Sequence, residues 1–191
     1  ARRPRSSARR RSASPKRRPA PIPMRLSAPS TFPLARSGTV TIARRANRRL
    51  ILAGNRAVEG ADAQFYHAEI APHVDGDRVR YIGAVDDTQK NALLGSAAAL
   101  LMPIEWDEPF GIVMIEAFAC GTPVIAFPRG SVAEVVQPGR TGFHCATSEE
   151  AAAAVSRLAT IDRTVVRAEC EERFSHDAIV TAYERLYREV A

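Results

Sequence analysis

The chain has 191 residues, of which 46% are hydrophobic and 25% are charged, a balance typical of one globular domain with or without a tail. Its longest uncharged run ends before Glu105 and is shorter than the ~18–20 apolar residues of a membrane span, so we do not expect an integral membrane protein. The three cysteines are widely spaced and form no CxxC pair, which argues against a disulfide scaffold or a zinc ribbon. This use of cysteine predicts a reducing, cytoplasmic compartment.

The net charge of +6 averages two unlike pieces. Ahead of the first acidic residue, Glu59, lie 16 Lys and Arg, whereas residues 59–191 hold the other 11 and all 21 acids, for a net charge of −10. Residues 1–38 are rich in Arg, Pro, Ser and Ala and show no hydrophobic period, so they cannot bury enough apolar surface to fold. We therefore predict a disordered basic tail over residues 1–38 and a folded domain over residues 39–191.

The basic tail has three interpretations. Clustered arginines suit a nucleic-acid arm, but no aromatic residue lies among them in residues 1–31, and we expect no nucleic-acid partner. A tract rich in Arg and Ser and free of acids also suits a transit peptide. The third interpretation, which we favour for the reason given below, is a stretch that arose out of frame.

The rest of the chain alternates short apolar runs with amphipathic segments. In chain order, the predicted elements are a helix at 39–47, a strand at 50–54, a helix at 62–73, a strand at 78–83, a helix after a capping box at 86–89, a strand at 97–102, a helix at 112–120, a strand at 123–127, a short helix after a capping box at 131–134, an edge strand at 142–145, and helices at 148–158, 162–174 and 175–190. This alternation predicts an α/β fold, a Rossmann-like parallel sheet with helices on both faces. Ligands in such sheets bind beyond the carboxyl ends of the strands.

Two glutamates flank the start of the helix predicted at 112–120. Glu108 lies in the preceding loop, and Glu116 follows after seven intervening residues. The helix amino terminus offers free N–H groups and a partial positive charge, and Gly111 permits close approach of a ligand. Carboxylates accept hydrogen bonds from sugar or ribose hydroxyls. The pattern indicates a polyhydroxylated anionic ligand. The spacing alone fits a second interpretation equally well, in which Glu108 is an acid at the start of a helix and Glu116 is a solvated helix residue.

The run EPFGIVMIEAFACGTPVIAFPRGSVAEVVQPGRTGF, residues 108–143, closely resembles the donor-binding, C-terminal domain of retaining glycosyltransferases of family 4, or group 1, which have the GT-B fold. The resemblance extends through RLILAGN, RVRYIG and ERFS to roughly residues 40–190. It implies one half of a two-domain enzyme that transfers a sugar from a nucleoside diphosphate sugar to a hydroxyl acceptor with retention. It also implies that no metal or other cofactor is needed.

The same resemblance implies roles for individual residues. Glu108 lies against the donor sugar as the catalytic residue, and Glu116 holds the ribose hydroxyls. Backbone groups of Phe110, Gly111 and Ile112 contact sugar and phosphate, and the base lies near Gly83 and Val85. No metal site is expected, because the DGD sequence at 75–77 is typical of a turn and the adjacent His and Cys at 144–145 supply only two ligands.

The chain departs from the family pattern before its first helix. Family members have there a strand ending in Gly-Arg and a loop ending in Lys-Gly, whose two cations hold the diphosphate. Here the basic tract replaces them, and no acceptor-binding domain is recognisable in the sequence, which is why an out-of-frame start is favoured. The alternative to an active enzyme is a truncated, catalytically inactive remnant that binds nucleotide sugars. Peripheral membrane contact of the full-length enzyme is compatible with both alternatives, the active enzyme and the inactive remnant.

Overall fold

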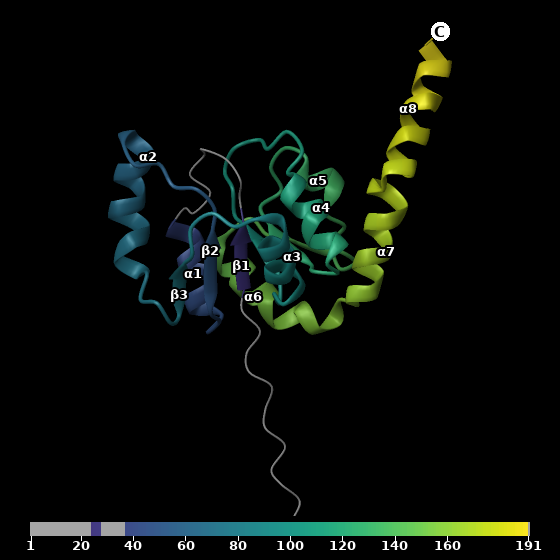
Figure 1. Cartoon of the computed structure of the whole chain (residues 1–191). Coiled ribbons are helices and arrows are strands. Elements are labelled where there is room, and N and C mark those ends of the chain that lie inside the picture. Colours follow the sequence, from purple (N-terminus) through teal and green to yellow (C-terminus); the bar gives the residue numbers. More distant parts are fainter. Residues whose placement is uncertain (1–23, 28–36, 191) are drawn as a thin grey trace, which may run out of the picture.

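The computed structural model describes residues 24–27 and 37–190. Their six strands form one sheet in the order β3-β2-β1-β4-β5-β6, which helices cover (Figure 1). All five strand pairings are parallel. The strands are β1 (Met24–Ser27), β2 (Leu50–Ala53), β3 (Val79–Tyr81), β4 (Leu100–Met102), β5 (Val124–Ala126) and β6 (Gly142–His144). The predicted α/β fold with a parallel sheet and helices on both faces is confirmed.

Helices connect successive strands and close the chain. They are α1 (Ser37–Arg45), α2 (Gly60–Phe65), α3 (Asp87–Gly95), α4 (Ile112–Ala119), α5 (Val132–Val135), α6 (Ser148–Arg157), α7 (Arg163–Phe174) and α8 (His176–Val190). A π-helical turn, η1 (Tyr66–Ile70), and a 3₁₀ turn, η2 (Ala71–His73), prolong α2, and the 3₁₀ turn η3 (Leu158–Thr160) follows α6. The helix α1 packs on α6, and α4 packs on α7 and α3.

The strand order changes direction between β1 and β4. The chain first builds the sheet outward through β2 and β3, and then returns to the other side of β1 to add β4, β5 and β6. In open parallel sheets, ligands bind beyond the carboxyl ends of the strands at this point. The loop from β4 to α4, which contains Glu108, starts there.

The core is densest around β4 and β5. Every residue of both strands is buried, because helices cover both faces of this half of the sheet. From α4, Met114, Ala117 and Phe118 are fully buried against these strands. In β2, buried and half-buried residues alternate, so one face of this half of the sheet is less covered.

The two predicted capping boxes have different outcomes. At α3 the box is confirmed: the Gln89 amide donates to Asp86 Oδ1 (2.8 Å), and the Asp86 amide donates to Gln89 Oε1 (3.1 Å). At α5 it is wrong, because Ser131 has helical backbone angles (φ −66°, ψ −13°) and its side chain makes no capping hydrogen bond. A capping side chain reaches the first-turn amides from an extended backbone, which Ser131 does not have.

The predicted disordered tail requires a correction. Met24–Ser27 forms the central strand β1, which pairs with β2 on one side and with β4 on the other, and α1 already begins at Ser37. Four residues carry too little periodicity to be recognised as a strand, and the hydrogen-bonding edges on both sides determine the conformation instead. The remainder of the predicted tail, residues 1–23 and 28–36, lies outside the described residues.

The last helix, α8, projects away from the sheet and its covering helices (Figure 1). The apolar residues that the sequence places on one stripe of this helix are exposed: Ile179 (38%), Tyr183 (57%), Leu186 (51%) and Val190 (73%). Within residues 24–27 and 37–190, no helix combines the length and the apolar character needed to cross a membrane.

Candidate functional site

A left-handed glycine starts the helix at the centre of the candidate site. Gly111, the N-cap residue of α4, has φ 72° and ψ 60°. A Cβ at this position would lie 2.7 Å from Met114 Cε, the end of a flexible side chain, and 3.3 Å from Glu108 Cγ, so the left-handed backbone more than the space favours glycine. The chain thereby turns sharply from the loop into α4, and the N–H groups of Ile112 and Val113, which precede the first bond of the helix from the Met114 amide to the Gly111 carbonyl (2.9 Å), are presented at the carboxyl edge of the sheet.

Glu108 is held by its own loop. The indole Nε1–H of Trp106 donates to Glu108 Oε2 (3.1 Å). The loop is in turn fixed to the segment after β5, because the Gly130 amide donates to Asp107 Oδ1 (3.1 Å) and the Ser131 amide donates to the Glu108 carbonyl (3.0 Å). Gly130 packs so closely that a Cβ on it would lie 2.6 Å from the Glu108 nitrogen.

Glu116 is held by a lysine from the neighbouring helix. Lys90 Nζ in α3 lies 2.6 Å from Glu116 Oε1 and 3.0 Å from Asp87 Oδ1. These two hydrogen bonds, that to Glu116 first, raise the pKa of Lys90 above its usual value. Among the described residues, Glu116 Oε2 is buried and has no hydrogen-bond partner. Our sequence interpretation missed Lys90, which directly follows the capping box of α3 but lies 26 positions before Glu116, so no local pattern pairs the two residues.

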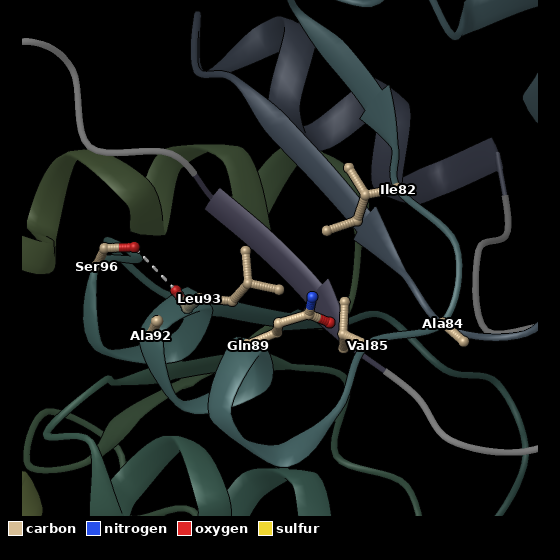
Figure 2. A pocket seen from close by; sticks show the side chains of 7 residues that line it. All are labelled: Ile82, Ala84, Val85, Gln89, Ala92, Leu93 and Ser96. Carbon is tan, nitrogen blue, oxygen red and sulfur yellow. Dashed lines mark hydrogen bonds between the residues drawn. The ribbon is translucent and has the colours of Figure 1, made fainter.

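The predicted site residues border three separate hollows. Val85 lines one of about 490 Å³ between α3 and the end of β3, together with Ile82 and Leu93 (Figure 2). Glu108 and Phe110 line a second of about 420 Å³, which reaches α5 and the end of α7. Glu116 lines a third of about 500 Å³ between α3 and α4. The structure thus brings Glu108 and Phe110 together and places Val85 and Glu116 against different faces of α3.

The remaining predicted contacts are backbone positions near these hollows. Gly83 has φ 73°, and its carbonyl accepts a hydrogen bond from the Gly54 amide (2.8 Å). Ile112 is 66% exposed at the start of α4. Phe110 is half exposed, and its ring meets that of Phe174 edge-to-face at 6.3 Å.

The candidate metal motifs are explained by local structure. Asp75 Oδ1 accepts hydrogen bonds from the amides of Asp77 and Val79, both at 2.9 Å, which confirms a turn and lowers the pKa of Asp75. Burial raises the pKa of the Cys145 thiol to about 11. In the part of the chain that the structure describes, no three His, Cys, Asp or Glu side chains gather as metal ligands would.

Comparisons with known proteins agree with this architecture. Residues 39–176 match the family model "Glycosyl transferases group 1". A phosphatidyl-myo-inositol mannosyltransferase of Mycobacterium leprae is 32% identical over 122 residues, which cover 60% of this chain and 33% of that protein. The structure of AviGT4, a glycosyltransferase involved in avilamycin A biosynthesis, superposes with a TM-score of 0.70 at 24% identity and covers 88% of this chain and 51% of its own. Anabaena HepE in complex with UDP-glucose superposes with a TM-score of 0.67 at 22% identity, covering 89% of this chain and 48% of its own.

The chain therefore belongs to the group 1 glycosyltransferase family, and its fold matches GT-B glycosyltransferases. It spans about a third of the length of the mannosyltransferase and about half the length of each of the two solved structures.

Proposed function

We propose that this chain is the donor-binding, C-terminal domain of a retaining glycosyltransferase of family 4, and that it binds a nucleoside diphosphate sugar. The observation that carries the proposal is the start of α4 at the direction change of the sheet. There the left-handed Gly111 exposes the helix amino terminus, and Glu108 and Glu116 flank it in sequence. A helix amino terminus stabilises a phosphate, while carboxylates bind hydroxyls, so the two kinds of group suit the two parts of such a donor.

In this proposal each contact has a separate role. Glu116 binds the ribose hydroxyls, and Glu108 binds hydroxyls of the donor sugar. The backbone of residues 110–112 contacts the diphosphate and the sugar, and the base lies near Gly83 and Val85, in the segment that leads into the amino terminus of α3. HepE, a structural neighbour, is known in complex with UDP-glucose, which makes uridine nucleotides the first donors to test.

The reaction breaks the bond between the anomeric carbon and the diphosphate oxygen, and forms a new bond from that carbon to the oxygen of an acceptor hydroxyl, whose proton passes to the leaving diphosphate. The positive end of α4 stabilises negative charge as it develops on the leaving diphosphate, a form of electrostatic catalysis. No metal is needed in this scheme. The acceptor binds to a second domain that faces the carboxyl edge of the sheet, and transfer requires both domains.

Calorimetric titration of the 191-residue chain with UDP-, GDP- and ADP-glucose tests the proposal. We expect saturable binding of one of them, weakened about tenfold or more by Glu116→Ala. Glu69→Ala, an exposed glutamate in η1, is the matched control and should leave the affinity unchanged. If none of the three donors binds, or if both variants bind like the wild type, the proposal is wrong.

A second candidate is a domain that binds donors without turning them over. The observation that favours it is the local sequence around β1: the strand ends in Leu26-Ser27 and α1 opens with Ser37-Gly38, where the resemblance implies Gly-Arg and Lys-Gly. Without those cations the diphosphate leaving group is less stabilised. Release of UDP from UDP-glucose by the chain, sensitive to Glu108→Gln, would contradict this candidate.

A further inference from the structure

The side chain of Lys90 in α3 is mostly buried and contacts two acids, Glu116 and Asp87. Its side chain is 18% exposed, that of Glu116 is 29% exposed, and that of Asp87 is 98% exposed. The contact with Asp87 is therefore screened by water, whereas the contact with Glu116 lies in a less hydrated groove between α3 and α4. Of the two ion pairs, the one with Glu116 is thus the stronger constraint.

The carboxylate of Glu116 is left half satisfied by this pair. One oxygen is bonded to Lys90 at 2.6 Å, and the other is buried and has no partner among the described residues. A buried acceptor without a donor is unfavourable, and a hydroxyl group of a ligand can supply that donor. Because one oxygen is fixed, the direction of the second oxygen is fixed as well.

The helices that carry the pair are fixed to each other at their far ends. Thr122 Oγ1 donates to the Leu94 carbonyl at the end of α3 (2.7 Å) and accepts a hydrogen bond from Arg163 (2.7 Å). Arg163 also donates to the carbonyl of Gly95 (2.9 Å). The two helices are therefore also held together away from the pair between Lys90 and Glu116, and the pair acts on the Glu116 side chain itself.

We propose that Lys90 is a positioning residue: it holds one carboxylate oxygen of Glu116 and turns the other toward the ribose hydroxyls of the donor. This inference rests on the proposed function, in which Glu116 binds ribose. The residue type suits the task, because a compact ammonium group reaches two carboxylates as a point donor, whereas a guanidinium group is a planar fork. In a sequence with 27 basic residues, Lys16 and Lys90 are the two lysines.

The test compares UDP with 2′-deoxy-UDP on the wild type, Lys90→Met and Lys90→Arg. Wild type should bind UDP about tenfold more tightly than 2′-deoxy-UDP, because the 2′-hydroxyl donates to a charged acceptor. Lys90→Met should weaken UDP about tenfold and 2′-deoxy-UDP less than about twofold, which removes the discrimination. Lys90→Arg should restore part of the preference for UDP over 2′-deoxy-UDP. GDP and ADP, with their 2′-deoxy forms, replace UDP if they bind more tightly.

Two controls separate positioning from other effects. Arg80→Met removes an exposed cation in the middle of β3 that contacts neither Lys90 nor Glu116 in the structure, and should leave the discrimination intact. Far-UV circular dichroism and the thermal midpoint show whether each variant is folded. A folded Lys90→Met protein that weakens UDP and 2′-deoxy-UDP equally, or weakens neither, overturns the inference.

The outcomes also separate this inference from the proposed function. If Glu116→Gln abolishes the discrimination but Lys90→Met preserves it, Glu116 binds ribose without help and only the role of Lys90 is wrong. If the wild-type chain binds none of the nucleoside diphosphates, the proposed function and the role of Lys90 fall together.

Discussion

The two carboxylates that flank the start of α4 are held in different ways. Glu108 lies in a loop and is bonded by a neutral indole N–H from Trp106, two residues away. Glu116 lies in a helix and is bonded by a charged ammonium group from Lys90 in a different helix. The position of Glu108 therefore depends on how the loop packs, whereas that of Glu116 depends on the pairing of α3 with α4.

This difference matches the two tasks proposed for them. Every donor of a given nucleotide presents the same ribose, so a rigid carboxylate between two fixed helices suits it. Donor sugars differ in the orientation of their hydroxyls, and a loop can change its sequence without disturbing the core. The predictions that follow disturb one support at a time.

Gly130→Ala should have the largest effect, because it disturbs the loop of Glu108. Gly130 has φ 52°, and a Cβ there would lie 2.6 Å from the Glu108 nitrogen and clash with the Glu108 carbonyl. We expect a loss of about 3 kcal/mol in the free energy of unfolding, measured by urea denaturation. Gly76→Ala is the matched control, since Gly76 has φ 78° with nothing within 4 Å, and should cost about 1 kcal/mol. Equal losses of stability in both variants would show that the loop of Glu108 moves to accommodate the added methyl group without cost.

Thr122→Val should have the next largest effect, because it disturbs the pairing of α3 with α4. The buried Thr122 hydroxyl joins the Leu94 carbonyl to Arg163, and its loss removes one hydrogen bond from each of these groups, which keep their other partners. We expect a loss of about 2 kcal/mol in the free energy of unfolding. Thr181→Val, at an exposed position of α8, should change stability by less than about 0.5 kcal/mol. A Thr122 variant as stable as the Thr181 variant would mean that the two helices are positioned by other contacts.

Trp106→Phe should have a smaller and more selective effect. It removes the indole N–H that donates to Glu108 Oε2 and keeps an aromatic ring against the core. If UDP-glucose is the donor, its affinity should fall about threefold to tenfold while that of UDP stays unchanged, since Glu108 loses a single hydrogen bond from a neutral donor. Equal weakening of both ligands in calorimetry would contradict a role through Glu108.

Lys90→Met should have the smallest effect on stability, about 1 kcal/mol or less near neutral pH. Its pH dependence follows from the pKa of Lys90, which the hydrogen bonds to Glu116 and Asp87 raise above 10.5. A cation whose pKa is raised in the folded state contributes stability below its unfolded pKa, and this contribution is lost as the pH rises through the folded pKa.

The stability difference between wild type and Lys90→Met should therefore be constant from about pH 7 to about pH 10 and should narrow at higher pH. Lys90→Arg is the control, because a guanidinium group stays protonated throughout this range. A difference that narrows between pH 7 and pH 9 would show that the ammonium group is not stabilised by its two acids.

The sequence predicted those features whose signal is local. The apolar runs of β4 and β5, the capping box of α3 and the helix after Gly111 are each encoded within a few neighbouring residues, and the structure confirms these elements. The prediction failed where a distant partner decides the conformation. Strand β1 is four residues stabilised by neighbours on both sides, and Ser131 has a backbone set by the packing of the Glu108 loop.

The supports of the site were missed for the same reason. Lys90 and Glu116 are 26 positions apart in the sequence, and Gly130 contacts a loop more than 20 positions before it. No local pattern identifies such pairs, whereas the fold brings them together. The assignment of ribose to Glu116 and of sugar to Glu108 comes from the resemblance and stays a prediction.

The most direct test of the account measures how the two carboxylates divide the donor. The affinities of UDP and UDP-glucose, or of the guanosine or adenosine pair if it binds more tightly, are compared by calorimetry for wild type, Glu108→Gln and Glu116→Gln. We predict that Glu116→Gln weakens both ligands by the same factor, about tenfold, and that Glu108→Gln weakens only the nucleotide sugar. If Glu108→Gln weakens UDP as much as UDP-glucose, or if Glu116→Gln affects neither ligand, the division of roles between the two glutamates is wrong.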